Sequence, residues 1–283
     1  MKLQNSMFHI YIVTPVLNAA DTIDATIWSV VTQQGDLHIH YHVQDAGSTD
    51  GTLEKLRDWQ KRLQDPGAVL ARIDFTFLSE PDGGIYDGLS KAFARLDIPE
   101  SAFMGWLGAG DRLWPGAFSV MADLEQDLPE VDWIMGWYSI IDHYGKVLTH
   151  NSGVVFPREL LTAGLAEMRH YQCVQQESTF WKKSLWDKAG RLDTSFKLAG
   201  DWDLWRRFAQ HRPLIHVQCN LGAWCSRPGQ LGGDANKYLA EVDAKIPNEV
   251  REYRLRSLLG KEKILPAPPL AARGDDGIWQ LLS

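Results

Sequence analysis

The first half of the chain alternates between short apolar segments and longer amphipathic ones, and this pattern constrains the fold more than any other feature. The apolar segments have the length of strands, and the segments between them have the apolar spacing of helices. Strands that alternate with helices are typical of a mostly parallel sheet with helices on both faces. We therefore predict an α/β fold with strands at 8–13, 38–44, 73–78 and 103–107 and helices at 21–34, 52–63, 85–95 and from near Pro115.

The residues that follow these strands are small, polar or acidic. In parallel α/β sheets, ligands bind beyond the carboxyl ends of the strands, near a reversal of strand order. Four consecutive strand ends have this character, at 14–18, 45–51, 80–84 and 108–111, and three of them carry carboxylates. The sequence therefore predicts a binding site at this edge of the sheet.

Asp45 ends an apolar segment and is followed by a turn sequence. Gly47 suits the turn and Asp50 suits the cap of the next helix, but neither role accounts for Asp45. In dinucleotide-binding folds, an acid at such a position accepts hydrogen bonds from a ribose. The segment 14–18 contains no G-x-G-x-x-G pattern, so a dinucleotide oxidoreductase is disfavoured.

Two further acids have both a structural and a chemical interpretation. Asp111 follows small residues that let a ligand approach the backbone, so it could hold a divalent cation or simply close a glycine-rich turn. Asp201 could be the N-cap of an amphipathic helix, or a base that deprotonates a hydroxyl nucleophile. In the second case Trp202 could stack on a sugar. Periodicity alone does not decide between these roles.

Charge and cysteine content disfavour other classes. The formal net charge is −7, which argues against a surface that neutralises many phosphates, so nucleic acid is not an expected partner. The three cysteines have no metal-like spacing and are expected to be free thiols in a reducing compartment. The apolar run near the start is too short to span a membrane, so a cytoplasmic protein is expected.

The second half of the chain is less regular. We predict a hairpin from 132–141 and 146–149, helices at 184–189 and 201–210, and a strand at 214–219. Gly190 suits a left-handed helix end.

A strongly charged helical segment begins at Lys237 and is broken by prolines from Pro266 onward. It is interpreted as a solvated helical face, or alternatively as a peripheral contact with an anionic membrane. We assign 1–233 to one domain, with halves 1–112 and 113–233, and 234–283 to a C-terminal helical extension and tail.

Several short motifs follow one another in a fixed order. They are IVTPVLN, QDAGSTDGT, SEPDGGIYDGLSKA and WLGAGD, followed later by QQESTFWKKS and GDWDLW. Together they resemble the motifs of the family 2 glycosyltransferases, which have the Rossmann-like GT-A fold. The resemblance covers roughly residues 8–212.

This resemblance implies an inverting transfer of a sugar from a nucleotide-diphosphate donor of the UDP, GDP or dTDP type. Asp201 matches the family's catalytic base, and Asp111 matches the last acid of its D-x-D-type motif for Mn²⁺ or Mg²⁺. The implied donor-binding residues are Thr14, Pro15, Asp45, Asp82, Lys91, Gly110 and Asp111, and the implied acceptor-binding residues are Gln176, Trp181 and Trp202.

Two positions depart from the family pattern. Gly110 precedes Asp111, and Gly108 stands two residues further back, where the family commonly has a second acid. The loss of one carboxylate predicts a weakened or absent dependence on the metal. Ser90 also stands where the family commonly has Asn. Neither change removes the expected base.

The sequence thus predicts an inverting hexosyltransferase that acts on a glycan or lipid-linked acceptor in surface polysaccharide biosynthesis. It is expected in the cytoplasm or at the inner membrane face, with homo-oligomerisation left open. One alternative is a nucleotide-sugar or carbohydrate-binding relative that has lost its chemistry. Another is a nucleotidyltransferase, which would need a basic phosphate loop after the first strand, but 14–21 contains neither Lys nor Arg.

Overall fold

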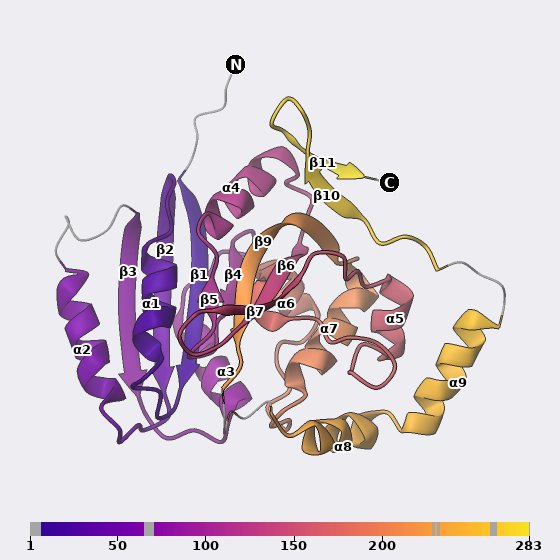
Figure 1. The fold of residues 1–283 in the computed structure, drawn as a ribbon, viewed down its shortest axis with the longest axis horizontal. Helices are drawn as coiled ribbons and strands as arrows, with labels where there is room; N and C mark the ends of the chain where they lie inside the picture. Colours follow the sequence, from indigo (N-terminus) through magenta and orange to yellow (C-terminus); the bar gives the residue numbers. More distant parts are fainter. Residues whose placement is uncertain (1–6, 65–70, 228–229, 231–232, 261–264, 283) are drawn as a thin grey trace.

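The computed structural model describes residues 7–64, 71–227, 230, 233–260 and 265–282 of the chain. Its strands form a single mixed sheet with helices on both faces (Figure 1). The strands are β1 (Phe8–Val16), β2 (Leu37–Asp45), β3 (Arg72–Ser79), β4 (Phe103–Trp106), β5 (Arg112–Leu113), β6 (Trp133–Ile141), β7 (Val147–Asn151), β8 (Thr179–Lys182), β9 (Ile215–Cys225), β10 (Leu270–Arg273) and β11 (Trp279–Leu282). The helices are α1 (Ile23–Val31), α2 (Thr52–Arg62), α3 (Ile85–Arg95), α4 (Ala117–Asp127), α5 (Arg158–Ala163), the 3₁₀ turn η1 (Gln176–Ser178), α6 (Lys183–Lys188), α7 (Gly200–His211), α8 (Ala235–Lys245) and α9 (Asn248–Leu259).

The sheet has the order β11-β10-β9-β6-β8-β4-β1-β2-β3. β3, β2, β1 and β4 are mutually parallel, as the alternating pattern predicted. β8 lies between β4 and β6 and is antiparallel to both. The carboxyl ends of β1, β2, β3 and β4 therefore lie along one edge of the sheet, where the predicted site residues follow.

Two apolar cores lie on opposite faces of the sheet. α1, α2 and α4 bury Ile27, Trp59 and Phe118 against one face. α3, α6 and α7 cover the other face, where Trp205 and Phe208 pack in an aromatic cluster. Alternation along β2 sends its isoleucine, tyrosine and valine to the first core and its histidines to the opposite face.

The structure confirms the predicted strands and helices of the first half and the α/β fold class. It also confirms the hairpin of β6 and β7, the positive φ of Gly190 (83°) and the free state of all three cysteines. The starts of two helices differ from the expectation. α1 begins at Ile23 after the cap residue Thr22 rather than at residue 21. α7 begins at Gly200 after the cap residue Ala199, so of the two interpretations of Asp201 the N-cap is excluded.

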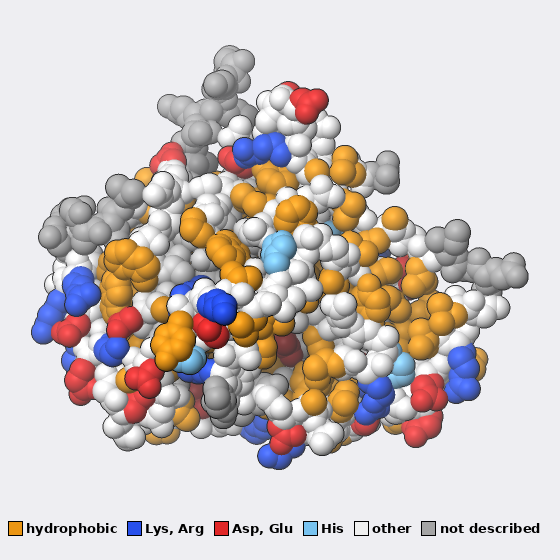
Figure 2. Space-filling view, viewed as in Figure 1, with side chains coloured by type: hydrophobic (Ala, Val, Ile, Leu, Met, Phe, Trp, Pro, Cys, Tyr) orange, Lys and Arg blue, Asp and Glu red, His pale blue; other side chains and the backbone are white. Residues whose placement is uncertain are grey.

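The C-terminal segment contains the expected helices α8 and α9, which lie beside one another at one end of the molecule (Figure 1). Figure 2 shows acidic and basic side chains interspersed around α9 rather than one charge alone. One of its arginines departs from the solvated-face interpretation. Arg251 is fully buried and forms ion pairs with Glu167 and Asp243.

The tail after the prolines was not predicted to be structured. It forms the hairpin of β10 and β11, and β10 extends the sheet by pairing in parallel with β9. Trp279 of β11 is buried in the core beside α4. Within the described residues, no helix combines the length and apolarity needed to cross a bilayer.

Candidate active site at the carboxyl ends of the strands

Asp45 organises the turn after β2. It is fully buried, and its two carboxylate oxygens accept hydrogen bonds from the backbone N–H groups of Gly47 and Ser48 and from the hydroxyls of Ser48 and Ser79. The hydroxyl distances are 2.5 Å and 2.6 Å. The carboxylate therefore holds this turn in shape through internal partners on both oxygens.

The loop after β1 is tied to the same turn. Thr14 is fully buried, and its hydroxyl pairs with the Tyr41 hydroxyl at 2.9 Å, so Thr14 also faces inward. Pro15 follows it and is partly exposed. Asn18 has a positive φ of 50°, and its amide oxygen accepts a hydrogen bond from the backbone of Thr49. Two strand ends that are distant in sequence therefore form one continuous rim.

Asp82 and Lys91 lie at the third strand end but do not pair with each other. Asp82 accepts a hydrogen bond from the backbone N–H of Gly84 at 2.8 Å, which fixes the start of α3. Lys91 instead forms an ion pair with Asp87 at 2.8 Å, one turn earlier on the same helix. Both side chains remain partly exposed at the rim.

Asp111 lies in a backbone cradle at the fourth strand end. Its Oδ1 accepts a hydrogen bond from the backbone N–H of Cys225 on β9, at 2.9 Å. Its Oδ2 lies against Gly108, where an added Cβ would approach within 2.6 Å. Burial raises the pKa of this carboxyl, against the opposing influence of the N–H group of Cys225 and the charge of Arg227.

The backbone conformation at position 110 favours glycine. Its φ is +112°, a backbone conformation that side chains rarely adopt, and an added Cβ would contact Cys225 at 3.4 Å. The side chain that the family commonly carries here would be strained in this backbone.

Asp201 lies in the first turn of α7 and is partly exposed. Its Oδ1 accepts a hydrogen bond from the backbone of Trp202 at 2.8 Å and lies 3.2 Å from the hydroxyl of Tyr86 on α3. Within the described residues, Oδ2 has no hydrogen-bond partner. Desolvation by burial raises the pKa of Asp201 to about 6, which is the range suited to a general base.

Glu177 was not predicted from sequence, although it stands in the quoted motif QQESTFWKKS. It is 2% exposed, and its Oε1 is buried with no hydrogen-bond partner among the described residues. Burial raises its pKa far above the usual range, and the charges of Asp111 and Asp201 raise it further. The neighbouring Gln176 donates to the carbonyl of Trp106, so Glu177 lies near the end of β4, the strand that Asp111 follows.

The predicted acceptor residues are packed inside the protein. Trp181 is fully buried between other tryptophans, and Trp202 is 3% exposed with its indole directed to the carbonyl of Gly164. Stacking on a sugar requires an exposed ring, so neither prediction agrees with the structure. Gln176 is partly exposed, and its amide donates to the carbonyl of Trp106 at the end of β4.

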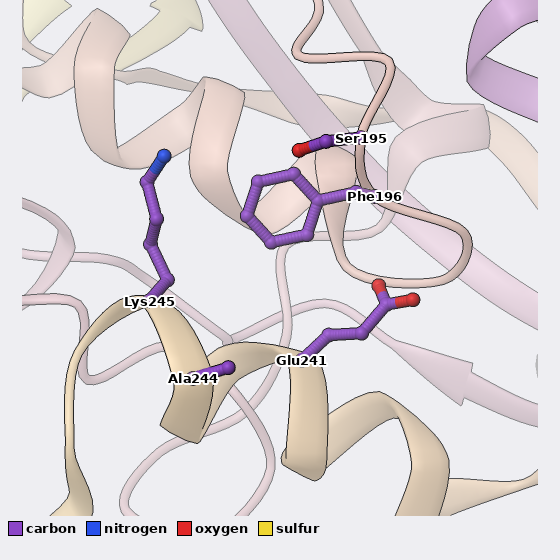
Figure 3. A pocket seen from close by; sticks show the side chains of 5 residues that line it. All are labelled: Ser195, Phe196, Glu241, Ala244 and Lys245. Carbon is purple, nitrogen blue, oxygen red and sulfur yellow. The ribbon is translucent and has the colours of Figure 1, made fainter.

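Glu241 of α8 is a second residue that sequence analysis missed, because no local pattern marks it. Its carboxylate accepts hydrogen bonds from the backbone N–H groups of Lys197, Leu198 and Ala199, at 2.9–3.1 Å. This segment leads directly into α7. In Figure 3, Glu241 points from α8 toward it, beside a hollow of about 220 Å³ under Phe196. α8 thus holds the segment directly before α7, the helix whose first turn carries Asp201.

We expect Gly200→Ala to disturb this arrangement from inside the protein. An added Cβ would lie 2.8 Å from the ring of Tyr86, which is buried and cannot move freely. The expected results are a loss of about 1–3 kcal/mol in the free energy of unfolding and a fall of roughly 100-fold in kcat as Asp201 is displaced. Thermal unfolding and steady-state kinetics measure the two effects. Gly153→Ala is the matched control, since a Cβ there meets open space.

Comparisons with known proteins agree with this geometry. The family model "Glycosyl transferase family 2" matches residues 11–95, which include the loops after β1, β2 and β3. No curated protein matches the chain.

Two solved structures of S. aureus TarS share the fold. TarS 1–349 in complex with UDP-GlcNAc has 12% identity and a TM-score of 0.59, over 90% of this chain and 72% of that one. The structure of S. aureus TarS has 12% identity and a TM-score of 0.55, over 90% and 43%. The resemblance is thereby confirmed for the first three motifs, which lie in the glycosyl transferase family 2 match at 11–95, and the chain as a whole has a GT-A-like fold.

Proposed function

We propose that this chain is an inverting glycosyltransferase that moves a sugar from a nucleoside diphosphate to an acceptor hydroxyl. The observation that carries the proposal is that three acids far apart in sequence are each tied to the carboxyl ends of the parallel strands. Asp111 follows β4, and Gln176, next to Glu177, donates to the Trp106 carbonyl at the end of the same strand. Asp201 lies 3.2 Å from the hydroxyl of Tyr86 on α3, the helix that follows β3 in the family-matched region. We assign donor binding to 1–112 and acceptor binding to 113–233. A glycan or lipid-linked acceptor in surface polysaccharide biosynthesis is part of the same proposal.

The proposed donor is a nucleotide-diphosphate sugar. A protein of the same fold binds UDP-GlcNAc, and we extend this class of donor to the present chain. Internal hydrogen bonds fix the shape of the rim formed by the loops after β1 and β2, and we assign nucleoside binding to this rim. A thermal-shift screen with UDP, GDP and dTDP sugars tests the assignment, because a ligand that binds the native state selectively raises its melting temperature.

In the proposed reaction, Oδ2 of Asp201 accepts the proton of the acceptor hydroxyl. The acceptor oxygen forms a bond to the anomeric carbon as the bond from that carbon to the diphosphate oxygen breaks. A single displacement of this kind inverts the configuration. Tyr86 and the backbone of Trp202 hold Oδ1, so that the second oxygen points to the acceptor.

The residues around Asp111 fit a divalent cation. A buried carboxylate oxygen of Glu177 lacks a hydrogen-bond partner among the described residues, and the charge of Asp111 raises the pKa of Glu177. A nearby positive charge favours the ionised form of such an acid. Asp111 and Glu177 would hold the cation, and Glu177 would compensate for the acid missing at position 110. When bound, the cation supplies positive charge that stabilises the leaving diphosphate.

The pH dependence of kcat/KM should report the ionisation of Asp201. Only the ionised carboxylate accepts a proton, so we expect kcat/KM to fall as the pH drops below about 6. In Tyr86→Phe, a hydrogen bond that lowers this pKa is lost, and the acid limb should move to higher pH. A pH–rate profile of both proteins tests this. An acid limb near 3.8, the ordinary value for an aspartate, would contradict the assignment.

A binding protein without catalysis is the competing proposal, and the glycine at position 110 favours it. The two proposals differ in one measurement. Donor hydrolysis or transfer that depends on Asp201 supports the enzyme, whereas donor binding with no turnover at any Mn²⁺ concentration supports the binding protein.

A further inference from the structure

Three histidines form a cluster at the opposite edge of the sheet from the candidate active site. His9 lies near the start of β1, and His38 and His40 lie near the start of β2. One ring nitrogen from each lies within 4.8 Å of the other two. Among the described residues, this is the one group of at least three histidine, cysteine or acidic side chains with such spacing.

The strand register builds the cluster. His9 and His38 are paired residues on neighbouring parallel strands, and His40 is two residues further along β2, so its side chain lies on the same face. His40 is in turn paired with Asp74 on β3. The histidines therefore lie on two adjacent strands, with Asp74 on a third, and the backbone ladder fixes their positions.

Hydrogen bonds orient all three rings: Nδ1 of His9 lies 3.0 Å from Nε2 of His40, and His38 is hydrogen-bonded to Asp74. One carboxylate oxygen of Asp74 lies 2.7 Å from Nε2 of His38 and 3.2 Å from Nδ1 of His40. A carboxylate that holds an imidazole in this way fixes its tautomer and increases its basicity as a metal ligand. The three rings differ in exposure: His38 is buried, His40 is half-buried and His9 is exposed. An ion from solvent can therefore reach the cluster past His9.

We propose that His9, His38 and His40 bind a transition-metal ion of the Zn²⁺ class, with Asp74 orienting the rings and water filling the remaining position. Three imidazole nitrogens favour Zn²⁺ over Mg²⁺ or Mn²⁺, which prefer oxygen ligands. The bound ion links β1 and β2 and so stabilises the fold. Burial and the neighbouring His38 lower the pKa of His40 to about 4, so its imidazole is neutral at pH 7. The charge of Asp74 opposes this lowering of the pKa of His40, whereas the positive charge of Arg72 adds to it and also repels a cation.

This site is separate from the catalytic cation site. His40 precedes Asp45 by five residues on the same strand, which corresponds to about 16 Å of extended chain. Asp111 lies beyond the carboxyl end of β4, at the catalytic edge. The inference therefore stands independently of the proposed transfer reaction.

The test uses the full chain after removal of metal. Zn²⁺ is added in competition with a chromophoric chelator, and Co²⁺ is used in parallel to detect the visible bands of a tetrahedral nitrogen site. We expect one equivalent to bind and to raise the melting temperature. His9→Ala should weaken binding at least 10-fold. His9 is exposed, so this variant tests the site without disturbing the core.

Two controls separate the site from other metal binding. His143→Ala removes an exposed histidine in the loop between β6 and β7 and should leave the affinity unchanged. Asp111→Asn should also leave Zn²⁺ binding at the histidines intact. Failure of the wild-type chain to bind one equivalent, or equal affinity in His9→Ala and wild type, would overturn the proposal.

Discussion

Asp201→Asn is expected to lower kcat by about 10²–10⁴-fold, the range associated with loss of a positioned general base. Asparagine has nearly the same shape and keeps the hydrogen bond from the backbone of Trp202, but it cannot accept the acceptor proton. Donor affinity should be unchanged, because Asp201 is assigned to the acceptor side. Single-turnover kinetics with a saturating donor separate the chemical step from binding.

Asp203 provides an internal control for this variant. It stands two residues further on the same helix and forms ion pairs with Arg206 and Arg207 at 2.8 Å and 2.7 Å. Asp203→Asn removes a buried charge from this network, so it should lower the melting temperature while kcat of the folded protein is retained. If Asp201→Asn instead keeps wild-type kcat, the base is another group.

The second large effect is expected at the acid pair of Asp111 and Glu177. Asp111→Asn and Glu177→Gln should each lower kcat by about 10²–10³-fold, comparable to the loss of one transition-state electrostatic contact. The double variant should lose little more than either single variant, because both act on the same leaving group. The concentration of Mn²⁺ or Mg²⁺ needed for half-maximal rate should rise in the single variants.

Asp123→Asn is the control for these measurements. Asp123 is an exposed acid on α4 that pairs with Arg273 of β10, far from the strand ends. Its replacement should leave both the rate and the metal dependence unchanged. Wild-type rates in Asp111→Asn and Glu177→Gln would contradict the assignment of the pair.

The first half of the fold could be predicted from sequence because its signals are local. The apolar period of each segment predicted β1 to β4 and α1 to α3, and it thereby assigned the residues after each strand to one edge of the sheet. β8 and β10 carried no comparable signal. Each is four residues long, and their strand conformation depends on neighbours contributed by distant parts of the chain.

The candidate site was predictable in place but not in detail. The motifs identified Asp111 and Asp201, but the internal partners of Asp45 include Ser79, which comes from another strand. The tryptophans were interpreted as sugar contacts because aromatic residues serve both surfaces and cores, and only packing distinguishes the two. Glu177 stands out because its buried Oε1 has no hydrogen-bond partner among the described residues, which only the folded structure reveals.

β10 has a consequence for association between molecules. It pairs with His216 and Val217 near the start of β9. The last residue of β9, Cys225, donates its backbone N–H to Asp111. A shortened chain that stops before Leu270 would leave unpaired backbone groups along the start of β9. An exposed strand edge of this kind can pair with strands of other molecules. The last hairpin thus covers this part of β9 and makes β11, with its exposed Leu281 and Leu282, the terminal strand of the described sheet.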